Sequence, residues 1–219
     1  MLMQFLNKLE RKYRKYAIPN LMTIIVFGMG LVFLLDSFTA PNPGYAYNLS
    51  SLLYFDRNAV FHGQVWRILT FLFLPLDSDP FFILFSLYFY WLIGNALERQ
   101  WGSFKFNIYY LCGMLGTIIS GLITGYATNT FLNLSLYLAF AILFPNFEIL
   151  LFFFIPIKMK YLGILECIGL VISLIFSSWT NRICILISLA NILLFFGKDL
   201  YKLIRAFIRR KRWQRRNRK

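Results

Sequence analysis

The stretch FKFNIYYLCGMLGTIISGLITGY, residues 104–126, decides the fold class of this chain. It is long and apolar enough to cross a bilayer as one helix, because about 20 residues cover the hydrocarbon core. Gly113, Thr117, Gly121 and Gly125 recur in it every four residues. Small residues at this spacing let two helix backbones approach closely. We therefore expect this helix to lie at the centre of a helical bundle, packed closely against its neighbours.

The whole composition suits a membrane. Of the 219 residues, 59% are hydrophobic and only 15% are charged, whereas a soluble domain is nearer one quarter charged. The same figures exclude a disordered chain and a coiled coil. Five more apolar segments predict spans at residues 21–38, 81–97, 131–144, 161–179 and 183–200. The sequence thus predicts an all-α membrane protein with a bundle of six transmembrane helices.

Three regions follow from this division. Residues 1–17 have apolar positions at helical spacing with lysine and arginine between them, which predicts an interfacial amphipathic helix. A cleaved signal peptide is the alternative for this end of the chain. Residues 18–200 form the membrane domain, and residues 201–219 a basic tail. Segments 39–79 and 147–155 hold apolar patches too short to cross a ~30 Å core.

The distribution of basic residues predicts the topology. Three arginines, Arg57, Arg67 and Arg182, fall in segments on one side of the predicted bundle, and the other 20 Lys/Arg fall on the side of both termini. The positive-inside rule places the richer side in the cytoplasm, and we expect a plasma membrane. Membrane lipids are the expected partners of the basic ends. We expect no specific binding to nucleic acid. The alternative is that the basic tail contacts a ribosome.

The cysteine pattern does not predict a metal site. Cys112, Cys167 and Cys184 all lie inside apolar stretches and have no Cys/His spacing typical of zinc. We expect no metal and no cofactor.

The fourth span is short and begins with polar residues. Its 14 residues, 131–144, make only about 21 Å of helix, and Asn129, Asn133 and Ser135 stand at its start. Lipid does not tolerate unpaired polar groups at this depth. We therefore expect this helix in the middle of the bundle, below a water-accessible dent.

Two motifs, in register with the six spans, carry a family resemblance. Trp66-Arg67 precedes the second span, and Glu98-Arg99 with Gly102 closes it. Over roughly residues 15 to 200 the chain resembles the rhomboid superfamily of intramembrane serine proteases and their inactive relatives, including the derlins. The motif residues themselves suit structural tasks. Arg67 can hold loop carbonyls or a lipid phosphate with its planar fork, and Gly102 allows a turn with positive φ.

The residues that carry protease chemistry in the family differ here. The resemblance implies a nucleophile in a Gly-x-Ser-Gly string on the fourth span, where this chain has Asn133-Leu134-Ser135-Leu136. It implies a histidine base on the sixth span, where Ser188 lies near the expected position. A His-x-x-x-Asn pair that helps to bind the oxyanion falls near Phe82 and Ser86.

A serine hydroxyl needs a positioned base to become a nucleophile. The single histidine, His62, lies in the first outer loop and would have to fold over the dent. We therefore expect a rhomboid-like pseudoprotease with no catalytic residue, which binds transmembrane client proteins without cutting them. One alternative is an active rhomboid protease with Ser135 as its nucleophile. Another is a lipid-handling or membrane-insertion helper with a basic lipid- or ribosome-facing tail.

A client cleft is expected beside the short fourth span. Its candidate residues are Asn129, Asn133, Ser135, Phe82 and Ser86. Glu166 is the one acid well inside an apolar run of the fifth span, and an intramembrane carboxyl is a functional candidate. The alternative is that Glu166 reaches toward the nearby Lys158 and Lys160 or stays protonated.

Overall fold

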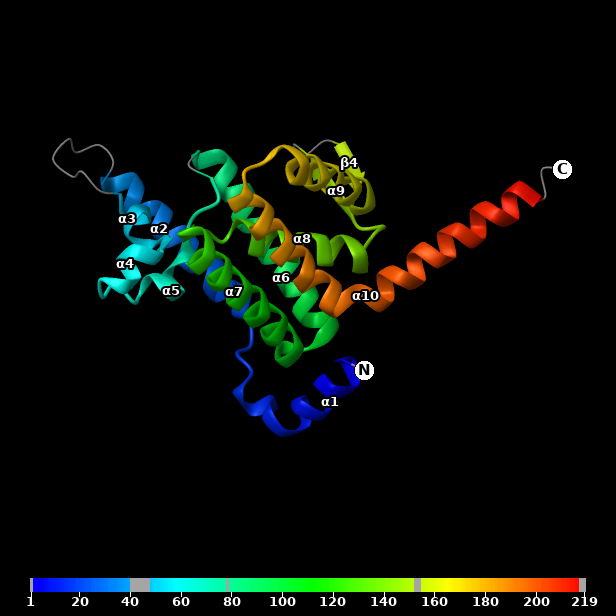
Figure 1. Cartoon of the computed structure of the whole chain (residues 1–219), viewed down its shortest axis with the longest axis horizontal. Helices are drawn as coiled ribbons and strands as arrows, with labels where there is room; N and C mark the ends of the chain where they lie inside the picture. The colour runs from blue at the N-terminus through cyan, green and yellow to red at the C-terminus, as the bar shows by residue number, and fades with distance from the viewer. Residues whose placement is uncertain (1, 40–47, 78, 152–154, 217–219) are drawn as a thin grey trace.

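Helices make up almost the whole molecule (Figure 1). The structure, a computed structural model, describes residues 2–39, 48–77, 79–151 and 155–216. Among these residues, five helices have the length and composition of a membrane span. They are α2 (Leu21–Thr39), α6 (Pro80–Trp101), α7 (Ser103–Thr124), α9 (Met159–Phe176) and the first part of α10 (Trp179–Arg216). The shorter α8 (Thr130–Leu143) stands where the fourth span is predicted, and the predicted all-α multi-pass membrane bundle is confirmed.

The short helix α8 lies at the centre of the bundle. It packs against α6, α7, α9 and α10, and its Leu132, Leu136 and Phe140 are buried. Helix α7 shares the centre because its glycines admit close neighbours. A Cβ atom added to Gly113 would lie 2.5 Å from Leu132 Cδ1, and one added to Gly116 would lie 2.6 Å from Ile187 Cγ2. The small-residue stripe thus sets the spacing of α7 to α8 and α10.

The loop between α2 and α6 folds into short helices. These are α3 (Leu49–Leu53), α4 (Arg57–Phe61), α5 (Arg67–Thr70) and the 3-10 turn η2 (Phe71–Phe73). Strand β1 (Phe55–Asp56) pairs antiparallel with β2 (Tyr126–Ala127), which connects α7 to α8. The pairing fixes this loop to the end of the bundle where α8 begins. Residues 40–47 and 78 of the predicted loop lie outside the described part of the chain.

The opposite end of the bundle carries the N-terminal helix and a hairpin. Helix α1 (Leu2–Tyr13) and the turn η1 (Arg14–Tyr16) occupy the predicted amphipathic segment. Glu10 of α1 forms an ion pair with Lys105 of α7, with 3.2 Å between Oε2 and Nζ. The apolar segment after α8 forms strands β3 (Glu148–Leu151) and β4 (Ile155–Lys158), paired antiparallel. Residues 152–154 lie outside the description.

The basic tail continues the sixth span as helix. Helix α10 runs from Trp179 to Arg216 and extends away from the bundle, in orange and red in Figure 1. Lysine and arginine have high helix propensity, so the change from apolar to basic residues at position 200 does not end the helix. Residues 217–219 are outside the described part of the predicted tail.

Candidate functional site

The Trp66-Arg67 motif organises the loop at the α8 end of the bundle. Arg67 is 6% exposed. Its Nη1 donates to the carbonyl oxygens of Ser51 and Tyr54, both at 3.0 Å, and its Nε donates to Gln64 Oε1 at 2.6 Å. Trp66, by contrast, is half exposed. The guanidinium therefore connects α5 to α3. It binds loop carbonyls, the first of the two partners expected for it, rather than a lipid phosphate.

The Glu98-Arg99 motif organises the other end. Glu98 is buried at the end of α6, and its Oε1 accepts hydrogen bonds from the Asn20 backbone N–H at 2.9 Å and from Ser103 Oγ at 2.6 Å. Gly102 has φ +82° between α6 and α7, a conformation that costs a glycine little. Arg99 is exposed. The carboxylate joins the starts of α2 and α7 to the end of α6.

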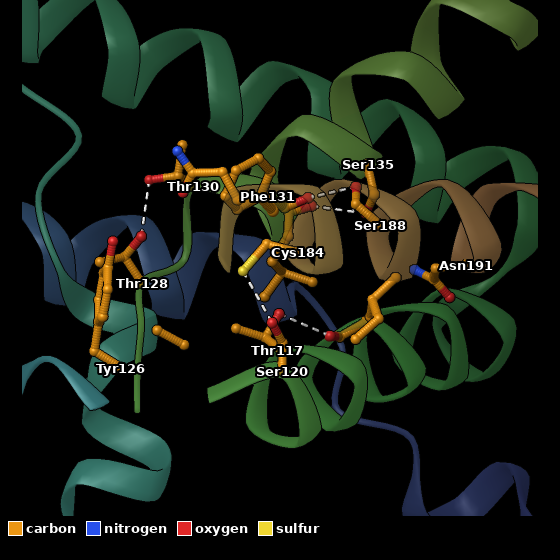
Figure 2. Close-up of a pocket in the computed structure, with 15 residues that line it drawn as sticks. Thr117, Ser120, Tyr126, Thr128, Thr130, Phe131, Ser135, Cys184, Ser188 and Asn191 are labelled. Carbon is orange, nitrogen blue, oxygen red and sulfur yellow. Dashed lines mark hydrogen bonds between the residues drawn. The ribbon is translucent and has the colours of Figure 1, made fainter. Parts of the chain in front are cut away.

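Ser135 and Ser188 line one cavity, which we call the hydroxyl cavity. It has a volume of about 220 Å³ and lies among α7, α8, α10 and the α7–α8 connection. Its lining is polar but contains, among the described residues, only hydroxyl, thiol and amide groups beside apolar ones. The polar members are Thr117, Ser120, Tyr126, Thr128, Thr130, Ser135, Asn181, Cys184, Ser188 and Asn191. All of them are drawn as sticks in Figure 2, which labels each of them except Asn181.

The two serines are already hydrogen-bonded. Ser135 Oγ donates to the Leu132 carbonyl oxygen at 2.7 Å, and Ser188 Oγ donates to the Phe131 carbonyl oxygen at 2.8 Å. The two hydroxyls thus bond to consecutive carbonyls of α8, as the dashed lines in Figure 2 show. On the facing helix, Thr117 Oγ1 donates to the Gly113 carbonyl oxygen at 3.0 Å. The hydroxyl protons of all three residues are therefore donated to backbone carbonyl oxygens.

The histidine lies elsewhere. His62 caps the C-terminal end of α4, is exposed, and its Nδ1 lies 2.7 Å from the Asn58 carbonyl oxygen. Ser135 is 1% exposed and bonds to α8 itself. His62 is not among the residues that line the hydroxyl cavity, so the imidazole and the Ser135 hydroxyl have separate surroundings.

The other residues predicted for a client cleft are dispersed. Asn129 is buried, and its Nδ2 donates to the carbonyl oxygens of Leu72 and Leu74 at 3.2 and 2.8 Å. Asn133 is fully buried, and its amide has no partner among the described residues. Phe82 is half exposed on α6. Of the five candidates, only Ser135 faces the hydroxyl cavity.

Ser86 faces a second cavity together with Glu166. This cavity, which we call the Glu166 cavity, has a volume of about 500 Å³ and is lined by α6, α8, α9 and the start of α10. Thr130, Phe131 and Asn181 line both cavities. The two cavities are therefore neighbours around the first turn of α8.

Sequence reasoning missed several lining residues of the hydroxyl cavity. Thr117 and Ser120 belong to the small-residue stripes of α7, where packing alone explains them. Asn191 follows Ser188 by about one helical turn, which places both on one face of α10. That spacing was the available signal, and the buried Asn191 Nδ2 has no hydrogen-bond partner in the described chain.

The fold and the cavities define a multi-pass integral membrane protein with a polar site at one end of its helical bundle. The family model of the Rhomboid domain matches residues 62–213, more than half of the chain. The chain therefore belongs to the rhomboid family. The matched region includes both motifs, α8 and the Ser188 position on α10. A search of curated proteins finds no match.

Proposed function

We propose that this protein is a rhomboid-family pseudoprotease, which binds transmembrane segments of other membrane proteins and does not cut them. The observation that carries the proposal is the hydroxyl cavity. At the positions that the family resemblance gives to nucleophile and base, the chain has Ser135 and Ser188, and both hydroxyls donate to carbonyls of α8.

The chemistry of this pair favours inertness. Proton removal from an alcohol needs a base such as imidazole held within hydrogen-bond reach. A second hydroxyl is far too weak a base at neutral pH to take that place. The oxyanion side is changed as well, because Phe82 and Ser86 stand near the positions of the family's His and Asn. The Ser86 hydroxyl is bonded to the Asp77 carboxylate.

Client binding is supported by the two neighbouring cavities. The Glu166 cavity lies between α6 and α9 and meets the hydroxyl cavity at Phe131. Helix α8 behind it is about 21 Å long, which favours a locally thinned bilayer. The end of a client helix that packs against α6 and α9 would contact the polar residues that line the two cavities. Such contacts would stabilise a client whose transmembrane span is short or interrupted by polar residues.

Photocrosslinking with a tagged client tests the proposal. The variant carries benzoylphenylalanine at Phe131, and the client is a single-pass leucine/alanine helix with a polar centre and a different tag at each end. We expect a crosslinked product that retains both tags after long incubation. The matched control places the same group at Phe27, an exposed position on α2, and gives a weaker product. A single-tag fragment that requires Ser135 would show an active protease and overturn the proposal.

The topology is part of the same proposal. The basic ends of α1 and α10 are placed on the cytoplasmic side of the plasma membrane, where each Lys or Arg near anionic lipid contributes about 1 kcal/mol. Reporter fusions at both termini test this placement. We expect a fluorescent protein to be active at each end, and alkaline phosphatase activity at either end would contradict the orientation.

A further inference from the structure

The Glu166 cavity has a polar stripe along one wall. Glu166, Leu170 and Ser173 line it from α9, with a spacing of four and three residues that puts them on one helix face. Ser177, the C-cap residue of α9, lines it as well. Helix α6 adds Ser86 and Tyr90. The stripe leads from the end of α9 nearest α10 inward to the carboxyl group.

Glu166 has no partner for its charge among the residues that the structure describes. Among the described residues it forms neither an ion pair nor a hydrogen bond, and the described lining of the cavity contains no Lys, Arg or His. Lys158, which the sequence offered as a partner, pairs instead with Glu148 across the hairpin, with 3.7 Å between Nζ and Oε1. A carboxylate left unpaired in a membrane span is unstable.

Depth excludes the lipid headgroup as the missing partner. Glu166 comes seven residues after Met159, the first residue of α9, and therefore lies about 10 Å along the helix axis. In a candidate span of 18 residues, this is well inside the helix rather than at its end. The amine of a lipid headgroup stays near the surface, whereas a side chain on another helix can present its charge at any depth.

We propose that the Glu166 cavity receives the lysine or arginine side chain of a client transmembrane helix that carries this residue at the depth of Glu166. The inference rests on the proposed function and names the class of client. A basic residue in a lone span is itself unstable in lipid, so pairing with Glu166 relieves two unfavourable charges at once. The cavity is too small for a whole helix but has room for one long side chain. The client backbone then lies along α6 and α9.

Co-reconstitution with designed helices tests this specificity. The probes are single-pass leucine/alanine helices that differ at one position, Lys, Gln, Glu or Leu, placed seven residues from the end that matches the start of α9. Capture is measured by crosslinking at Phe131 in liposomes. We expect the Lys helix to be captured at least about tenfold better than the Leu helix, in keeping with coupling energies of close charge pairs.

Three variants of the protein identify the carboxyl group as the cause. Glu166→Gln should remove the preference for lysine, and Glu166→Lys should shift it to the Glu helix. Glu148→Gln is the matched control, because this carboxyl is exposed on the hairpin, and it should leave the lysine preference unchanged.

Two results would overturn the inference in distinguishable ways. Equal capture of the Lys and Leu helices by the unmodified protein, or unchanged capture of the Lys helix by Glu166→Gln, refutes the specificity and leaves client binding intact. If the unmodified protein captures none of the helices, the proposed function fails together with the inference.

Discussion

The motif residues and the hydroxyl cavity differ in what their polar groups do. Arg67 and Glu98 each hold separate segments together, through hydrogen bonds to residues of other elements. Ser135 and Ser188 donate to carbonyls of α8, one of the helices that line the cavity. Arg67 and Glu98 thus connect elements of the scaffold, while the two serine hydroxyls bond to neighbouring carbonyls of one helix. Polar residues at the two ends of the bundle therefore join separate segments, whereas the two serines of the cavity bond to a single part of α8.

Removal of Arg67 should have the largest effect on stability. Arg67→Ala leaves the carbonyls of Ser51 and Tyr54 without their charged donor, and we expect a loss of about 3 kcal/mol in the free energy of unfolding. Denaturant titration in mild detergent measures it. Arg57→Ala is the matched control, because Arg57 makes one exposed bond to the Leu122 carbonyl oxygen, and should cost under about 1 kcal/mol. Equal losses would mean that the motif is not a special structural element.

Two glycine substitutions should have opposite signs. Gly113→Ala places a Cβ atom 2.5 Å from Leu132 Cδ1 and 3.0 Å from Asn191 Nδ2, so overpacking should cost about 1–3 kcal/mol. Gly169 on α9 has open space around it, and Gly169→Ala should be neutral or stabilise by up to about 1 kcal/mol through helix propensity. Thermal unfolding of both variants checks the pair. A neutral Gly113→Ala would show that α7 is not closely packed at the cavity.

A smaller loss of stability than for Arg67→Ala is expected at the serines. Ser188→Ala and Ser135→Ala each remove one hydrogen bond to a backbone carbonyl, which should lower the free energy of unfolding by about 1 kcal/mol. Client capture at Phe131 should stay unchanged in both. A variant that folds normally yet loses client capture would make that hydroxyl part of the binding surface.

Local patterns predicted most of the scaffold. The apolar spans, the stripe of Gly113 and Gly121, and the positive φ of Gly102 all follow from residues close together in sequence. The predicted sixth span ends at residue 200, where the apolar run ends. Helix α10 continues to Arg216 because lysine and arginine favour helix as well. No signal in the sequence indicated the β1–β2 pairing, whose strands are about 70 residues apart.

The site was less predictable because its contacts are distant in sequence. The amide of Asn129 bonds to carbonyls at Leu72 and Leu74, which no spacing within α8 could indicate. The family resemblance placed Ser135 at the nucleophile position and Ser188 near the position of the histidine base. The structure brings both residues to one cavity. The Glu166 cavity depends on how four helices pack. The signal available in the sequence was the helical spacing of Glu166, Ser173 and Ser177.

Labelling with a fluorophosphonate probe tests the central claim most directly, because the probe reacts with a serine only where a base activates its hydroxyl. The reconstituted protein is compared with Ser135→Ala, and Ser188→Ala serves as the matched control. We predict that the three proteins show the same background labelling. Labelling that is strong in the unmodified protein and in Ser188→Ala, yet absent from Ser135→Ala, would contradict the account and show an active intramembrane protease.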